Sequence, residues 1–216
     1  MSIGIHLKSR LLAGGVGMVL AAAGCSLMEP RSERYEPPVA GTTYENARRD
    51  TGSYGSSSVR IPSRYLGEIS WQGERVHAFE SSEQTFHGTV GDRFAFIRAV
   101  KGDSPLVTWN PPAGWELPLV VGKKWKRQYT MTLHTAARAI AVEDAQEIEA
   151  FEDVTVPAGT YKAWRVRTVD NQGNENLHWY APALGIFIKQ SLRRTSRHPA
   201  GPGTREIELA AYKRGG

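Results

Sequence analysis

The segment from Phe151 to Gln190 constrains the fold more than any other part of the chain. It contains four short runs rich in β-branched and aromatic residues, Val154 to Val156, Tyr161 to Val169, Leu177 to Tyr180 and Ile186 to Leu192. Turn formers separate them: Pro157-Ala158-Gly159, the cluster from Asp170 to Asn174, and the turn from Pro182 to Gly185. Connections this short can join only antiparallel neighbours, so the segment predicts a four-stranded antiparallel meander.

The same pattern extends on both sides of this segment. Hairpins are predicted around Gln72-Gly73, joining 64–71 to 75–80, and around Gly91-Asp92, joining 86–90 to 94–100. Residues 125–133 alternate cleanly, and residues 205–212 read as a last strand. Alanines make 135–147 compatible with a helix, but its β-branched residues favour a strand, which we prefer. The fold class is therefore mainly β, an antiparallel meander forming a curved sheet or partial barrel.

One detail of this pattern has two possible explanations. In the strand after Pro157, Tyr161 and Ala163 point to one face while Trp164 and Val166 point to the other. Either a bulge re-aims one pair or both faces of the strand are buried. Residues 109–115, between two tryptophans, contain Pro111 and Pro112 and are predicted to form a rigid loop.

Three stretches carry a resemblance to a known group of proteins. VTVPAGTYKAWRV, the downstream WYAPALGIFIK, and PLVVGKKW at 118–125 resemble TapB-like lipoproteins and related bacterial envelope domains of unknown function. The resemblance covers about residues 112–192. It implies an antiparallel sheet curled into a partial barrel, and it offers no catalytic residues to carry over.

The N-terminus has the organisation of a secretory signal. Lys8 and Arg10 precede an apolar stretch of about thirteen residues, too short to span a bilayer as a helix, and small residues lead to Cys25, the single cysteine of the chain. This resembles a lipoprotein signal peptide, residues 1–24, with cleavage between Gly24 and Cys25 and acylation of Cys25. Ala22 stands where that class prefers Leu, and the alternative is ordinary cleavage after the alanines, which would release a soluble protein. By the sorting rule of the lipoproteins that this segment resembles, Ser26 after the cysteine implies the outer membrane, facing the periplasm, as the location.

Residues 25–58 are predicted to form a flexible tether, because breakers and small polar residues interrupt every sustained period. The lipid on Cys25 would attach this tether to the membrane. The folded antiparallel β domain is then expected to comprise residues 59–216.

No established catalytic motif occurs in the sequence. It contains no H-E-x-x-H zinc motif, no G-x-S-x-G elbow and no phosphate-binding or dinucleotide loop, so we expect no metal and no cofactor. The formal charge of +5 falls to +3 without residues 1–24, which is too small and too dispersed to indicate nucleic acid. We therefore expect a non-enzymatic binding module for an apolar or amphiphilic ligand or for an envelope partner.

The candidate ligand-binding residues are aromatic. Trp109, Trp115 and Trp179 could stack against a ligand, although tryptophans at such positions more often plug the end of a barrel. One alternative is a scaffold component that docks acidic partners through the basic segment from Arg193 to Arg205. The other is a periplasmic hydrolase in which His178 is the general base, although a hydrogen-bonded sheet histidine is the duller interpretation.

Overall fold

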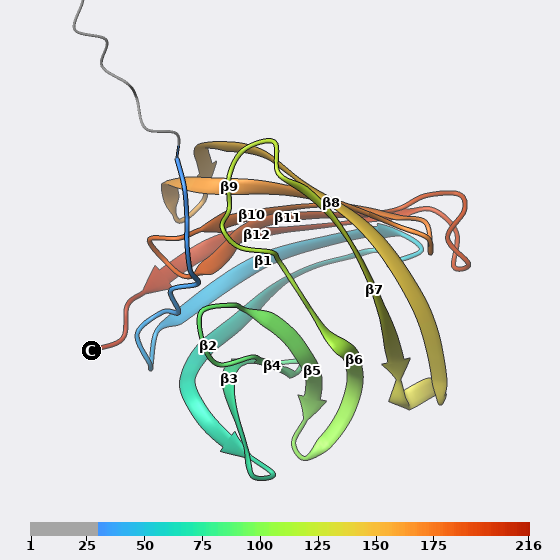
Figure 1. Ribbon diagram of the computed structural model, residues 1–216, viewed down its shortest axis with the longest axis horizontal. Helices are drawn as coiled ribbons and strands as arrows, with labels where there is room; N and C mark the ends of the chain where they lie inside the picture. Colours follow the sequence, from blue (N-terminus) through green and yellow to red (C-terminus); the bar gives the residue numbers. More distant parts are fainter. Residues whose placement is uncertain (1–29) are drawn as a thin grey trace, which may run out of the picture.

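The computed structural model describes residues 30–216, which form a closed antiparallel barrel with nearly all neighbours consecutive in sequence (Figure 1). The first six strands are β1 (Thr43–Gly52), β2 (Ser57–Trp71), β3 (Glu74–Ser81), β4 (Thr85–Gly88), β5 (Ala95–Lys101) and β6 (Ser104–Gly114). The next six are β7 (Lys124–Leu133), β8 (Arg138–Val156), β9 (Gly159–Asp170), β10 (Asn174–Ala181), β11 (Ile186–Arg194) and β12 (Gly203–Lys213). Pairing of β1 with β12 closes the barrel.

The predicted meander is confirmed, and its strands close completely instead of leaving a partial barrel. Gln72 and Gly73 both have positive φ, 50° and 83°, as a two-residue hairpin turn requires, and they join β2 to β3. The strand preferred for residues 135–147 is confirmed from Arg138 onward. It follows a single turn of 3-10 helix, η1 (His134–Ala136).

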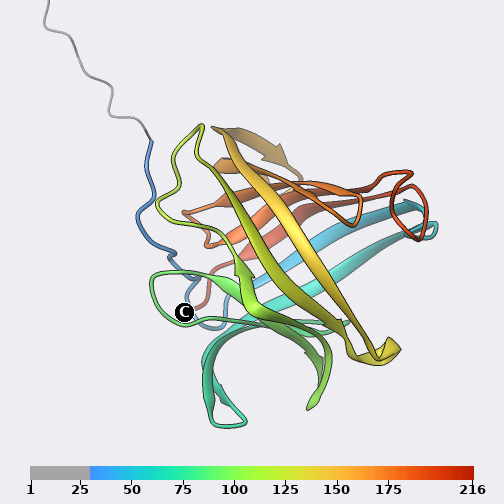
Figure 2. The ribbon, with the colours of Figure 1, turned by 45° about the vertical axis from the view of Figure 1, so that its right-hand side comes forward.

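The barrel is not a regular cylinder. Strands β2 to β6 curl tightly into a lower lobe, whereas β7 to β12 and β1 form a longer, flatter wall (Figures 1 and 2). Register shifts accompany this coiling in β2, at Leu66, and in β8, at Glu149. In the part of the chain that the structure describes, no helix is long and apolar enough to cross a bilayer.

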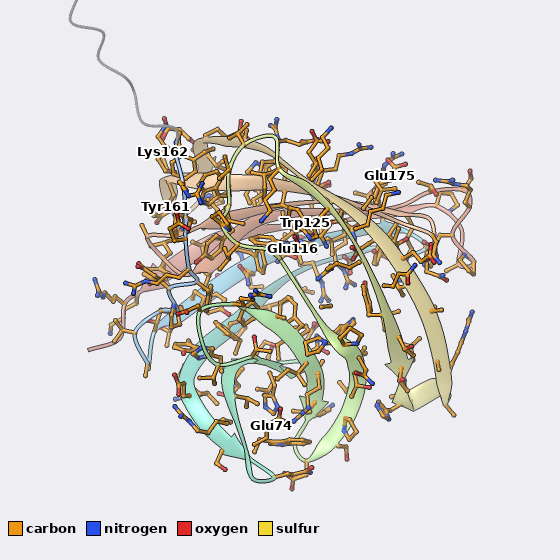
Figure 3. The ribbon with its side chains drawn as sticks, viewed as in Figure 1. Glu74, Glu116, Trp125, Tyr161, Lys162 and Glu175 are labelled. Carbon is orange, nitrogen blue, oxygen red and sulfur yellow. The ribbon has the colours of Figure 1, made fainter. Side chains whose placement is uncertain are left out.

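Both faces of β9 are buried at its centre, which resolves the phase conflict seen in the sequence. Ala163 belongs to a cluster with Val154, Ile188 and Leu209. The next residue, Trp164, belongs to a second cluster with Ile148 and Trp125. Figure 3 shows Trp125 among the side chains between the long strands. The pairing of β9 with β10 runs without a shift, and the extra residue lies in β8, so burial of both faces is the main explanation.

The predicted boundary at residue 59 is wrong. Strand β1 lies inside the proposed tether and pairs with β12 on one side and β2 on the other. Residues 30–42 before it also pack on the barrel, so the folded part includes most of the segment assigned to the tether. Residues 1–29, with Cys25 and the predicted signal peptide, lie outside the described residues.

The loop predicted between the two tryptophans is also wrong, because residues 104–114 form strand β6. The two prolines are accommodated at an irregularity of the β5–β6 ladder, where they pair with neither neighbouring strand. Val107 and Thr108 pair with both β5 and β7, whereas Ala113 and Gly114 pair with β5 alone. A proline cannot donate a ladder hydrogen bond, and Pro111 and Pro112 lie between these two paired stretches.

Candidate functional site

The inward face of the long wall can be followed through the strand register, because directly opposed residues share a face. One row runs from Ile148 through Val166, His178, Gln190, Ile207 and Arg48 to Val59. On β10, Tyr180 lies two residues beyond His178 and faces the same way, and it pairs with Phe187. Phe187 stacks on Phe96 of β5, a non-neighbouring strand, with ring centroids 6.4 Å apart. This face is therefore the lumen of the barrel.

Aromatic rings from distant strands meet in one part of the lumen. Trp115 lies edge-on to both Phe187 and Tyr180, with centroid distances of 5.1 and 5.7 Å. Phe96 connects this group to Trp109 at 6.0 Å. We call Trp109, Trp115, Tyr180, Phe187 and Phe96 the aromatic set. Two of the three tryptophans singled out in the sequence are thus brought together.

The third tryptophan, Trp179, is not part of this set. It precedes Tyr180 on β10 and so points to the opposite face of the sheet. There its indole Nε1 donates to Glu152 Oε1 at 3.0 Å, and the Lys189 ammonium lies 5.7 Å from its ring. Trp179 therefore has a structural role on the other face.

A polar row lies on the same lumenal face, on the side of His178 away from the aromatic set. The register places Trp125, Gln146, Thr168, Asn176, Leu192, Arg205 and Asp50 side by side. The Arg205 guanidinium donates to both carboxylate oxygens of Asp50, at 2.7 and 2.9 Å. That hydrogen bond, the charges of Arg205 and Arg48 and the hydroxyl of Ser57 hold the pKa of Asp50 below its usual range, against the opposing effect of burial.

A second buried ion pair lies beside this row. Arg127 donates to both oxygens of Asp144, at 3.2 and 2.6 Å, and the Asp144 side chain is only 1% exposed. Gln146 Nε2 donates to the same carboxylate at 3.2 Å. We call Gln146, Thr168, Asn176, Arg205 and Asp50 the polar row.

The exposure of the side chains changes along this lumenal row. Along the His178 row, Ile148 and Val166 are fully buried, His178, Gln190 and Ile207 are half-buried, and Val59 is 39% exposed. The row is therefore tightly packed on the β8–β9 side, and its side chains become more exposed toward β1 and β2.

His178 sits between the aromatic set and the polar row. Its ring lies 5.6 Å from that of Phe187, and its strand neighbours are Val166 and Gln190. Burial lowers the pKa of His178 to about 4, so the imidazole is neutral at pH 7. Within residues 30–216 no carboxylate hydrogen-bonds to it, so the hydrolase hypothesis lacks the carboxylate that would orient such a base.

The N-terminal strap, as we call residues 30–42, lies across the aromatic end of the barrel. Ser32 and Leu119 exchange two backbone hydrogen bonds, at 3.1 and 2.8 Å. Tyr35 inserts its ring next to Phe94 and Tyr180, with centroids 4.8 and 6.0 Å away, and burial raises the pKa of its hydroxyl. The strap therefore closes this mouth with an aromatic side chain.

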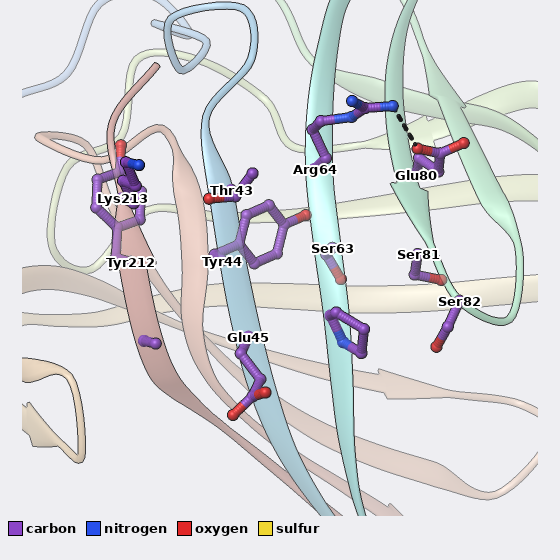
Figure 4. A pocket seen from close by; sticks show the side chains of 12 residues that line it. Thr43, Tyr44, Glu45, Ser63, Arg64, Glu80, Ser81, Ser82, Tyr212 and Lys213 are labelled. Carbon is purple, nitrogen blue, oxygen red and sulfur yellow. Dashed lines mark hydrogen bonds and ion pairs between the residues drawn. The ribbon is translucent and has the colours of Figure 1, made fainter. Parts of the chain in front are cut away.

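A separate groove of about 680 Å³ runs over β12, β1, β2 and β3 near the chain terminus (Figure 4). Tyr44 and Tyr212 are its aromatic lining, and burial raises the pKa of Tyr44 to about 12. Arg64 and Glu80 pair across it at 3.1 Å. Most of its remaining lining is exposed.

The basic segment considered for partner docking is largely engaged within the chain. Arg194 and Arg205 both stack on Tyr54, at 3.9 and 4.8 Å from the ring, and Arg193 pairs with Glu175. These cations are therefore less available to an acidic partner than the sequence suggested. In the described residues, no three His, Cys, Asp or Glu side chains are placed to hold a metal ion.

Comparisons with known proteins find similar solved structures but no matching protein family. No family model matches the chain and no curated protein matches it, so the resemblance to TapB-like lipoproteins stays a prediction. A Parabacteroides distasonis protein described as a lipoprotein shares 10% identity at a TM-score of 0.48, covering 84% of this chain and 99% of that one. A Bacteroides fragilis protein described as exported, with a YmcC-like fold, shares 11% sequence identity at a TM-score of 0.47. The match covers 84% of this chain and 100% of that one. The hypothetical lipoprotein YmcC of Escherichia coli shares 14% sequence identity at a TM-score of 0.45. The match covers 83% of this chain and 89% of that one.

Proposed function

We propose that this chain is a membrane-anchored envelope lipoprotein that binds an amphiphilic ligand in its barrel lumen without catalysing a reaction. Acylation of Cys25 would supply the anchor, and Ser26 after it favours the outer membrane. The binding proposal rests on one observation. Along one lumenal wall the side chains change from apolar to polar, from the aromatic set through His178 to the polar row.

The aromatic set suits an alkyl chain. Each methylene removed from water contributes about 0.8 kcal/mol, and flat rings from different strands offer apolar contact on several sides. Phe187 is central, because it contacts Trp115, Tyr180, Phe96 and His178. The polar row and His178 would then face the head group, where hydrogen-bonding groups replace water.

Fluorescence titration tests this proposal. The probe is a dansyl-labelled undecanoate, added to the full-length chain carrying Cys25→Ser so that bound lipid does not compete. We expect saturable enhancement of dansyl fluorescence, and Phe187→Ala should weaken binding by about tenfold, the equivalent of about 1.4 kcal/mol. Trp179→Phe is the matched control, because it changes an aromatic residue of the neighbouring strand on the opposite face.

The pattern of results separates the alternatives. Equal loss of binding in both variants would indicate general destabilisation instead of a lumenal site. Absence of saturable binding in the Cys25→Ser chain would remove the ligand proposal and leave docking of an envelope partner as the remaining function.

A further inference from the structure

The strongest unexplained feature of the lumen is a group of buried polar atoms that lack partners. Gln146 Oε1, Asn176 Oδ1 and His178 Nδ1 are each inaccessible to solvent and have no hydrogen-bond partner among the described residues, and the donor Trp125 Nε1, next to Gln146 in the same row, has none either. The register places Gln146 and Asn176 in one row, separated by Thr168, with His178 two residues from Asn176 on the same face. Native proteins pair such atoms because leaving them unpaired is costly.

The orientation of the Gln146 amide is fixed by its surroundings. Gln146 is only 4% exposed, and its Nε2 donates to the Asp144 carboxylate. Turning the amide over would place its oxygen against that carboxylate, which only accepts hydrogen bonds when ionised. The Asp144 carboxylate is itself fixed by Arg127. Oε1 is therefore an acceptor held in place and directed away from the ion pair.

The charges around this group argue against an ionised ligand. An anionic head group would meet acceptor oxygens and the nearby Asp144 carboxylate, while Arg127 is already occupied by Asp144. A cationic head group would meet the arginines Arg48, Arg127 and Arg205, whose carboxylate partners are already occupied in ion pairs. Neutral donors such as hydroxyl groups satisfy the acceptors without either repulsion.

We propose that Gln146, Asn176 and His178 form a subsite for an uncharged head group rich in hydroxyls, so that the lumen selects neutral glycolipid-like amphiphiles over fatty acids. This inference rests on the proposed binding function and specifies its ligand class. A neutral imidazole can accept at one nitrogen and donate at the other, which matches a hydroxyl in either role.

The test compares two amphiphiles of equal chain length, dodecyl maltoside and dodecanoate, each below its micellar concentration. Their displacement of dansyl undecanoate from the Cys25→Ser chain gives both affinities. We expect the maltoside to bind at least tenfold more tightly. Gln146→Met should weaken the maltoside about three- to tenfold, the effect of one lost neutral hydrogen bond, and weaken dodecanoate clearly less, because an ionised carboxylate has no proton to donate to Oε1. Gln128→Met, an exposed residue of β7, is the control.

A second variant keeps the test informative if Gln146→Met fails to fold. Asn176→Ala removes another acceptor at a half-buried position and should show the same selective loss. Equal affinity for the two amphiphiles, or no selective loss in either variant, would overturn the subsite and leave amphiphile binding intact, with ordered water as the partner of these atoms. Failure of dansyl undecanoate itself to bind would instead overturn the proposed function.

Discussion

The hydroxyl of Tyr35 donates a hydrogen bond to the backbone carbonyl of Gly185, 3.0 Å away, joining residues 150 positions apart in the sequence. This contact connects the strap to the β10–β11 turn and places an aromatic ring in the mouth of the barrel. It shows that residues before β1 belong to the folded unit.

Tyr35 should therefore contribute measurably to stability. Tyr35→Phe loses one hydrogen bond and is expected to lower the free energy of unfolding by about 1 kcal/mol. Tyr35→Ala also loses the packing of the ring and should cost about 3 kcal/mol. Urea titration followed by tryptophan fluorescence measures both. Val39→Ala, at an exposed position of the same segment, should change little, and neutral effects in all three variants would show that the strap is not docked.

Gly185 should be required for docking of the strap. A Cβ at this position would lie 2.5 Å from the carbonyl oxygen of Glu36 and 2.7 Å from the nitrogen of Pro38. Gly185→Ala should therefore displace the strap and accelerate tryptic cleavage after Arg31 and Arg34.

Gly73→Ala is the matched control for that experiment. Both glycines have positive φ, 70° and 83°, but a Cβ at Gly73 meets no other atom within 4 Å. This variant should lose about 1 kcal/mol from backbone strain without exposing the strap. Similar cleavage rates in the two variants would contradict the close-contact explanation.

The ion pair between Asp50 and Arg205 should stabilise the lumen at neutral pH. Asp50→Asn leaves a partly buried guanidinium without its carboxylate and is expected to cost about 2 kcal/mol. Because the folded pKa of Asp50 is lowered, its contribution is present above the unfolded pKa and is lost as pH falls below about 4. The variant should therefore lose less stability than the wild type in that range.

Glu45→Gln is the comparison for Asp50→Asn. Glu45 pairs with Arg60 at 3.0 Å on the surface, where both side chains are well exposed. Surface pairs contribute little, so unfolding free energy at pH 7 should change by less than about 1 kcal/mol. An equal effect of the two substitutions would mean that burial of the Asp50 pair is unimportant.

His178 should produce a separate pH dependence. Its folded pKa of about 4 lies below the unfolded value, so the unfolded chain takes up the proton first. Stability is expected to fall as pH drops from about 6.5 toward 4, by up to about 3 kcal/mol from this residue. His178→Gln should flatten that part of the curve in urea titrations across pH. His77 and His87 are also buried with lowered pKa values, so only the difference between variant and wild type reports on His178.

Cys25 should carry the membrane anchor. In cells given radiolabelled palmitate, the wild-type chain should be labelled and should fractionate with the envelope membranes. Cys25→Ala should abolish both properties without changing the barrel. Equal labelling of the two chains would show that Cys25 is not the acylated residue.

The meander could be predicted because adjacent residues specify each turn, as in Gln72-Gly73 and in Pro157-Ala158-Gly159. Strand β1 could not, because it carries charge on a buried face. Asp50 and Arg48 point into the lumen and become tolerable only when Arg205, distant in the sequence, lies beside them. A local pattern contains no sign of that partner.

The strap and the site escaped prediction for related reasons. Pro37 and Pro38 are typical of a flexible segment, and only the contacts with Leu119 and Gly185 order it. Adjacent aromatic residues at 179 and 180 leave open which one faces inward, and the register assigns that place to Tyr180. The unpartnered acceptor of Gln146 depends on the orientation of an amide, which no sequence pattern records.

The docking of Ser32 against Leu119 sets a limit on how far an anchored barrel could stand from its membrane. Seven peptide units join Cys25 to Ser32, and an extended chain gains about 3.5 Å per residue, so the reach is about 25 Å. An acylated protein would thus be held with the strap-covered end of its barrel close to the membrane. The membrane lipids would then lie next to the mouth that Tyr35 closes. A ligand would enter the lumen elsewhere, on the side of β1 and β2.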